Sequence, residues 1–108
     1  MDEREFHQRI EALFEQITCF IDEHDLDVLD YDENDGVLIL ETSAGAKIIL
    51  SKQTPISQLW VAAPTGGFHF DYDVDGECWR NDRDKTTLAV CLAEITSRLL
   101  ATPIQFPI

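Results

Sequence analysis

Residues 37–72 read VLILETSAGAKIILSKQTPISQLWVAAPTGGFHFDY. Short apolar runs alternate in this stretch with segments rich in Gly, Pro and Ser, a pattern typical of strands separated by turns. The stretch predicts four strands, at residues 37–41, 47–50, 57–63 and 68–72. The breaks between them fall at residues 43–45, around Pro55 and at the loop of residues 64–67. Because connections this short join antiparallel strands, we expect an antiparallel sheet.

A long amphipathic helix is predicted before these strands, at residues 3–22. Asp2 and Glu3 suit its start, because acidic side chains cap the first turn and complement the helix dipole. Seven apolar side chains recur at helical spacing and occupy one face: Phe6, Ile10, Leu13, Phe14, Ile17, Phe20 and Ile21. The helix therefore needs an apolar layer to cover that face.

Three further elements complete the chain. Residues 26–33 alternate acidic with apolar side chains and predict a strand with a bulge at Val28-Leu29, followed by an Asn-Asp-Gly hairpin signal. A last short strand is expected at residues 77–80. A second helix is expected at residues 85–101, with Asp84 as its cap. The order is thus helix, about six strands, helix.

The second helix also has a single apolar face, formed by Leu88, Cys91, Leu92, Ile95 and Leu99. Two helices with one apolar face each are buried together when both pack on the same side of the sheet. The sequence therefore predicts the α+β class: a two-layer α-β sandwich, in one domain over residues 1–108, with the opposite sheet face in solvent.

Composition excludes several classes of protein. The chain has 108 residues and a formal charge of −13, whereas proteins that bind nucleic acid or anionic membranes cluster Lys and Arg. The acidic N-terminal segment lacks the apolar run of a signal peptide and the arginines of a transit peptide. No run approaches the length of a membrane span. Three cysteines without CxxC spacing indicate reduced thiols. We expect a cytoplasmic protein without nucleic-acid or membrane partners.

The charge is concentrated near the start of the chain. Residues 1–35 hold thirteen Asp and Glu against two Arg, whereas residues 36–108 hold eight acids against six basic residues. Eight of the early acids are candidate metal ligands and are called the acidic ridge below: Glu11, Glu15, Asp22, Glu23, Asp25, Asp27, Asp30 and Asp32. Carboxylate oxygens suit hard cations, which a ridge without a pocket would bind weakly and through water. The alternative is a solvated surface that maintains solubility and protects an edge strand.

His24 lies among these acids and is either a further ligand or an ordinary surface histidine. No Ser-His-Asp order, nucleophile elbow or phosphate-binding loop is present, so the residues do not predict an enzyme.

Residues 71–82 match the spacing of a calcium-binding loop, D-x-D-x-D-G with an acid at the twelfth position. The matching residues are Asp71, Asp73, Asp75, Gly76 and Asp82. The residues before the loop argue against calcium, because Phe68-His69-Phe70 alternates as a strand and Gly66-Gly67 opposes an entering helix. A strand–turn–strand hairpin is favoured over a calcium-binding domain.

Trp60 is the remaining feature. Strand alternation places Leu59 beneath the helices and Gln58 and Trp60 on the solvated face. A large exposed aromatic side chain is a candidate anchor for a protein partner, or it packs within its own sheet.

Three blocks of the sequence strongly resemble the frataxin family, in its bacterial form. They are Lys47-Ile48-Ile49-Leu50 with Gln53 and Pro55, then Gln58-Leu59-Trp60-Val61-Ala62, then Gly66-Gly67-Phe68-His69-Phe70-Asp71. Glu5-Phe6-His7 and the acidic run of residues 22–27 extend the resemblance over essentially the whole chain. The sequence departs from the family at Thr18 and Cys19, where relatives usually carry acids.

The resemblance implies the same α-β sandwich, with ferrous and ferric iron bound weakly by the carboxylates of the acidic ridge. It implies a non-enzymatic role in iron–sulfur cluster assembly, as regulator of a cysteine desulfurase and donor of iron. A monomer that forms oligomers with metal is expected. The expected partners are the desulfurase and the scaffold protein, contacted by Asp22, Glu23, Asp25, Asp27, Gln58 and Trp60. The alternative is a ferroxidase that oxidises and stores iron on the ridge.

Overall fold

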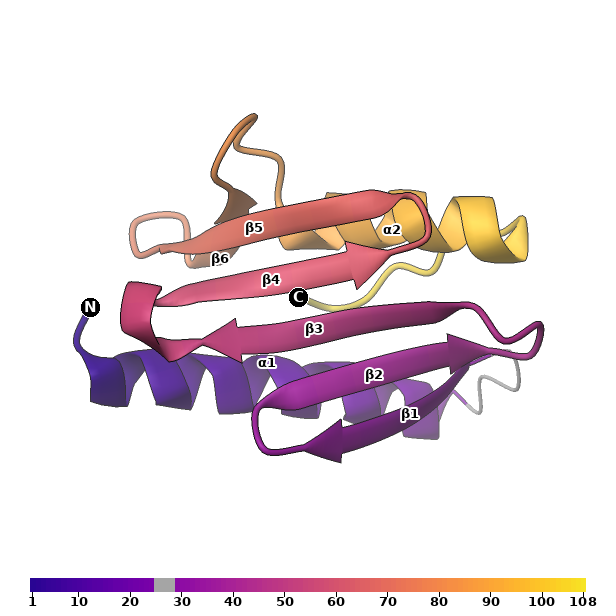
Figure 1. Ribbon diagram of the computed structural model, residues 1–108, viewed down its shortest axis with the longest axis horizontal. Helices are drawn as coiled ribbons and strands as arrows, with labels where there is room; N and C mark the ends of the chain where they lie inside the picture. The colour runs from indigo at the N-terminus through magenta and orange to yellow at the C-terminus, as the bar shows by residue number, and fades with distance from the viewer. Residues whose placement is uncertain (25–28) are drawn as a thin grey trace.

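The computed structural model describes residues 1–24 and 29–108. Its elements in chain order are α1 (Glu3–Glu23), β1 (Leu29–Asn34), β2 (Val37–Thr42), β3 (Lys47–Gln53), a 3-10 turn η1 (Thr54–Ile56), β4 (Gln58–Ala63), β5 (Gly66–Asp73), β6 (Cys78–Asn81) and α2 (Leu88–Leu100). Figure 1 shows the sheet in front and both helices behind it. The predicted fold class is confirmed.

The six strands form one antiparallel sheet in the order β1-β2-β3-β4-β5-β6. Leu38 pairs with Leu50, Leu50 with Val61, and Val61 with Phe68, so one apolar row crosses four strands. Leu38, Leu50 and Val61 are at most 1% exposed. Because side chains alternate between the faces of a strand, this row faces the helices and fixes the opposite face as the outer one.

Helix α1 has the predicted amphipathic character. The Asp2 side chain accepts a hydrogen bond of 2.8 Å from the amide of Glu5 and caps the helix. Six of the seven predicted apolar residues are buried against the sheet, and Phe20 is half-buried. The Phe20 ring lies 5.4 Å from that of Phe106, which is buried in the chain that follows α2. The C-terminal segment thus contributes to the core.

The second helix begins later than predicted, at Leu88 rather than at residue 85. Its cap is Thr87, whose side chain accepts from the amide of Val90, and Asp84 accepts from the amide of Thr86 in the turn before. Lys85 has a φ of +65°, which a right-handed helix cannot contain. The sequence pattern therefore predicted a first helical turn at residues that form a hydrogen-bonded turn before the helix.

The predicted loop of residues 64–67 is also too long. Gly66 and Gly67 pair with Ala63 and Ala62 and belong to β5, so the turn consists of Pro64 and Thr65. Glycine was interpreted as a loop signal, whereas the sheet accommodates it at a strand end. The predicted bulge at Val28-Leu29 and the start of that strand include residues outside those the structure describes.

Within residues 1–24 and 29–108, neither helix is long and apolar enough to cross a membrane.

Candidate functional site

The helical part of the acidic ridge lies on the exposed side of α1. Glu11, Glu15, Asp22 and Glu23 are all exposed, while the residues between them that face the sheet are buried. The amphipathic pattern that buries the apolar face directs these carboxylates into solvent. Glu11, Glu15 and Asp22 form a stripe of negative charge along the helix, because residues four and seven apart lie on the same side. Glu23 lies beside the end of this stripe.

One hydrogen bond joins the end of this stripe to the sheet. The Tyr31 hydroxyl on β1 donates to Oδ2 of Asp22 over 2.7 Å. This hydrogen bond raises the pKa of the Tyr31 phenol above its ordinary value, and desolvation and the negative charge of Asp22 add to the effect. Tyr31 was not among the predicted site residues, and its place on the alternating strand beside Asp30 and Asp32 was the only signal for it.

The strand part of the ridge faces a different direction. Leu29 is buried and Tyr31 reaches α1, so the alternation of β1 places Asp30 and Asp32 on the outer face of the sheet. Their register partners there are Glu41 and Ile39. The six described carboxylates are therefore not one surface, since those of α1 lie on the helix layer and those of β1 face the outer side of the sheet. Asp25 and Asp27 lie outside the described residues.

Thr18 and Cys19 introduce neutral groups into α1. The Thr18 hydroxyl donates to the carbonyl oxygen of Phe14 at 3.0 Å, so its hydrogen is used in a hydrogen bond within α1. Cys19 is an exposed free thiol. Within residues 1–24 and 29–108, His, Cys, Asp and Glu side chains form no group of three or more that could hold a metal ion. The described carboxylates of α1 thus offer fewer than three protein ligands at any one place, which suits a hydrated cation.

His24 follows α1 and is exposed. Its Nδ1 lies 3.1 Å from the carbonyl oxygen of Phe20, and its ring lies 4.2 Å from the Phe20 ring. A carbonyl oxygen only accepts, so this hydrogen bond requires the hydrogen on Nδ1 and leaves Nε2 as the acceptor of a neutral ring. Nε2 is then the atom of His24 that can bind a metal.

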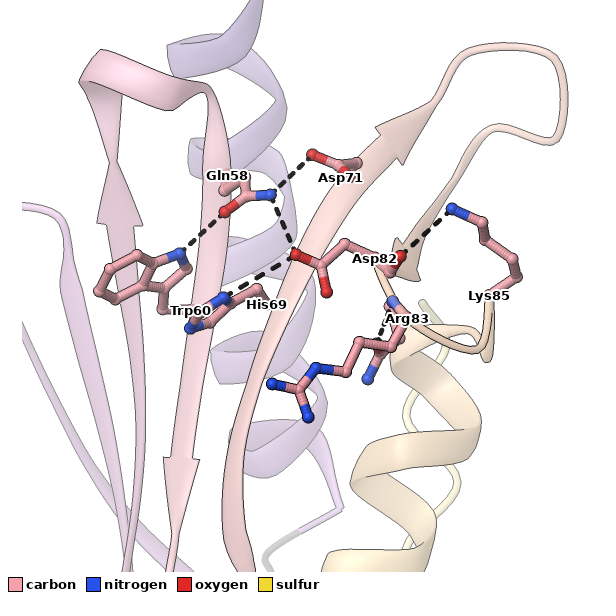
Figure 2. Close-up of polar contacts among 8 residues, drawn as sticks. Gln58, Trp60, His69, Asp71, Asp82, Arg83 and Lys85 are labelled. Atoms are coloured by element: carbon pink, nitrogen blue, oxygen red, sulfur yellow. Dashed lines mark hydrogen bonds and ion pairs between the residues drawn. The ribbon is translucent and has the colours of Figure 1, made fainter.

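A second group of polar side chains lies on the outer face of the sheet and is called the outer-face cluster below: Gln58, Trp60, His69, Asp71 and Asp82. Figure 2 shows its members converging from β4, β5 and the chain after β6. Leu59 is buried and Gln58 and Trp60 are half-buried, so the predicted facing of this strand is confirmed.

The cluster is held by short contacts. The Trp60 indole is stacked on the His69 imidazole, with centroids 4.4 Å apart and planes inclined by 15°. Trp60 Nε1 donates to Gln58 Oε1 at 3.0 Å, and Gln58 Nε2 donates to Asp71 at 3.1 Å and to Asp82 at 3.4 Å. A cavity of about 340 Å³ adjoins the cluster, lined by residues that include His69, Asp82 and Arg83. Trp60 thus packs within its own sheet and still faces solvent.

The calcium-like segment is a strand–turn–strand hairpin, as the sequence favoured. Oδ2 of Asp73 accepts from Arg80 at 2.7 Å, and its Oδ1 accepts from the amides of Asp75 and Gly76 at 3.1 Å each. The Arg80 hydrogen bond, helped by the amide of Gly76, lowers the pKa of the Asp73 carboxyl below its ordinary value. Both oxygens of Asp73 are therefore engaged in holding the hairpin.

Comparison with known proteins agrees with this architecture. The model of the frataxin-like domain matches residues 1–102. The chain is 41% identical to the iron-sulfur cluster assembly protein CyaY of Pseudomonas aeruginosa, over 99% of this chain and 98% of that protein. It is 38% identical to the protein of the same name from Azotobacter vinelandii, over 99% and 96% of the two chains.

Solved structures give the same result. Frataxin from Psychromonas ingrahamii superposes with a TM-score of 0.89 at 30% identity and covers all of both chains. A trimeric frataxin from Saccharomyces cerevisiae, complexed with ferrous iron, superposes with a TM-score of 0.68 at 26% identity, over 94% of this chain and 88% of that one. The fold, the register and the similarity over the whole chain lead to one conclusion: this chain belongs to the frataxin-like family.

Proposed function

We propose that this chain is an iron-binding protein of iron–sulfur cluster assembly, and that it acts in the cytoplasm as a regulator of the cysteine desulfurase and as a donor of iron. The observation that carries the proposal is the stripe of exposed carboxylates along α1 in a chain whose residues 36–108 are almost neutral. Family membership supports it, because relatives that match over the whole chain are named iron-sulfur cluster assembly proteins.

Iron is the cargo in this proposal and is held weakly. The carboxylates of the acidic ridge are hard oxygen ligands, which suit both ferrous and ferric iron. The members described on α1 are exposed and belong to no described group of three or more metal-ligating side chains, so the ion keeps part of its water shell and exchanges readily. A yeast frataxin that shares the fold is complexed with ferrous iron, which supports the choice of metal. Weak binding suits delivery better than storage.

The same stripe is proposed to meet a basic surface of the desulfurase. Exposed carboxylates attract such a surface over roughly 8–10 Å at physiological ionic strength and mainly raise the association rate. The outer-face cluster is proposed to contact the scaffold protein, with Trp60 as the anchor and Gln58 at its side. The two partners would then use opposite layers of the sandwich, and one monomer could contact both.

The test compares two triple variants of equal charge change. The ridge variant carries Glu11→Gln, Glu15→Gln and Glu23→Gln, which leaves the Asp22–Tyr31 hydrogen bond intact. The control variant carries Asp75→Asn, Glu77→Gln and Glu94→Gln, three exposed acids outside the ridge. Calorimetry with the cysteine desulfurase should show binding weakened on the order of tenfold for the ridge variant and less than about twofold for the control.

Equal weakening by both variants would mean that the desulfurase responds to the total charge of the protein and not to the position of the charges. No weakening by the ridge variant would refute the ridge as the contact. A ferrous iron titration followed by amide NMR should shift resonances of α1 in the wild type and in the control. Loss of these shifts in the ridge variant is expected, and their persistence would place the iron elsewhere.

A further inference from the structure

Trp60 is held by two of its neighbours on the outer face. It lies directly opposite His69 in the register of β4 and β5, and the two rings are nearly parallel at 4.4 Å. At the same time its indole N–H is taken by Gln58 Oε1 at 3.0 Å. One face of the indole and its only polar atom are therefore engaged within the protein, as Figure 2 shows.

The two neighbours are themselves fixed. The Gln58 amide nitrogen donates to carboxylates from two other segments, Asp71 and Asp82, at 3.1 and 3.4 Å. The backbone amide of Asp82 donates to the carbonyl oxygen of His69 at 2.9 Å, and Oδ2 of Asp82 lies 3.9 Å from His69 Nδ1. These contacts connect β4, β5 and the chain after β6, so the ring stack is supported from three segments.

We infer that His69 is a positioning residue that holds the Trp60 indole in the conformation in which it binds the protein partner. This inference rests on the proposed outer-face contact with the scaffold protein. A half-exposed tryptophan without such support exchanges between rotamers, and a partner must then immobilise it at a cost in affinity. Stacking on His69 lowers that cost, because the side chain is already ordered before the partner arrives.

The same geometry defines the chemistry of the partner's surface. The indole N–H is already satisfied by Gln58, so the partner need not supply a hydrogen-bond acceptor for it. What remains exposed is apolar ring surface, since the other ring face is covered by His69. The structure therefore points to an apolar pocket on the scaffold protein as the acceptor of Trp60.

The first measurement uses this protein alone. In ¹⁵N NMR relaxation, the indole N–H of Trp60 should have a high order parameter in the wild type, a clearly lower one in His69→Ala and a restored one in His69→Phe, because phenylalanine keeps a ring to stack on. Trp79 is 5% exposed and provides the internal reference, which should not change. An equally ordered Trp60 indole in His69→Ala would overturn the inference whatever happens to binding.

The second measurement is affinity for the scaffold protein. We expect His69→Ala to weaken binding roughly two- to tenfold and His69→Phe to bind within about twofold of the wild type. His7→Ala, on the opposite layer, is the matched control and should bind as the wild type does. Failure of phenylalanine to rescue binding would overturn the positioning role. If Trp60→Ala leaves affinity unchanged, the outer-face contact itself fails, a result that is separate from the indole dynamics.

Discussion

The acidic ridge and the outer-face cluster differ in how their side chains are held. Among the residues that the structure describes, carboxylates lie close to a basic side chain in Glu3–His7, Asp82–His69 and Asp73–Arg80, and none of these contacts includes a ridge carboxylate. Each member of the outer-face cluster, by contrast, contacts another member. In the proposed function the ridge would act through charge at a distance, and the cluster through a fixed shape.

This difference predicts different responses to mutation. A charged stripe tolerates the loss of one member, because its field is the sum of many charges and each is screened by salt. A contact built on one pre-ordered aromatic anchor does not tolerate the loss of that residue, because a single side chain supplies most of the binding energy.

The largest expected effect is that of Trp60→Ala. Removal of the proposed anchor should weaken binding to the scaffold protein by about thirtyfold or more, the loss typical of an interface hot spot. Calorimetry against the scaffold protein measures this loss directly. Glu15→Gln is the contrasting variant and should change the same affinity by less than about twofold. A similar loss from both substitutions would contradict the separation of the two surfaces.

An increase in salt concentration should produce the next largest effect and should distinguish the contact of the acidic ridge from that of the outer-face cluster. Raising the ionic strength from about 50 to about 500 mM is expected to weaken binding to the desulfurase on the order of tenfold, because exposed charges are screened. The fold-loss of affinity for the scaffold protein that Trp60→Ala causes should be nearly the same at both salt concentrations. A salt-independent affinity for the desulfurase would argue against the ridge as its contact.

The Asp73–Arg80 pair gives a smaller effect, on stability at acid pH. The folded-state pKa of Asp73 is lowered, so its contribution to stability is present above the unfolded-state pKa and is lost as the pH falls through the lowered folded-state value. Asp73→Asn should therefore lower the Tm at neutral pH and flatten its fall below about pH 4. Thermal unfolding followed by circular dichroism from acid to neutral pH tests this, with Asp75→Asn as the control. Identical profiles for Asp73→Asn and the wild type would show that the pair does not stabilise the hairpin.

The smallest expected effect concerns Tyr31. Its folded-state pKa is raised, so its contribution to stability is present below the ordinary phenol pKa and is lost as the pH rises through the raised value. Asp22→Asn should lower the pKa of Tyr31, because it removes the carboxylate that accepts the hydroxyl hydrogen. Ultraviolet titration of the phenol, with Glu11→Gln as the control, measures the change. An unchanged titration in Asp22→Asn would mean that the hydrogen bond does not join α1 to β1 in solution.

Most of the fold could be predicted because local patterns agree with the final packing. The apolar face of residues 3–22 and the short strands of residues 37–72 require an antiparallel sheet covered on one side. The errors fall at element ends, where patterns are ambiguous. Lys85 adopts a positive φ that keeps it out of the second helix, and Gly66 joins a strand although glycine signals a loop.

The candidate sites were predictable only in part. The carboxylates of α1 and the outward facing of Trp60 follow from periodicity, and both are found as expected. Tyr31, His69 and the role of Asp82 in the cluster were missed, because they depend on contacts between residues far apart in the sequence. The separation of Asp30 and Asp32 from the helical carboxylates was also missed, since it depends on how β1 faces α1.

The sequence by itself determined the class of fold, the location of the negative charge and the outward facing of Trp60, since periodicity and composition are local properties of the chain. Only the tertiary structure decided which side chains meet. The register of β4 and β5 brings Trp60 onto His69, and the packing of α1 on the sheet brings Tyr31 to Asp22. Such contacts depend on strand register, in which a shift of one residue turns every side chain to the other face.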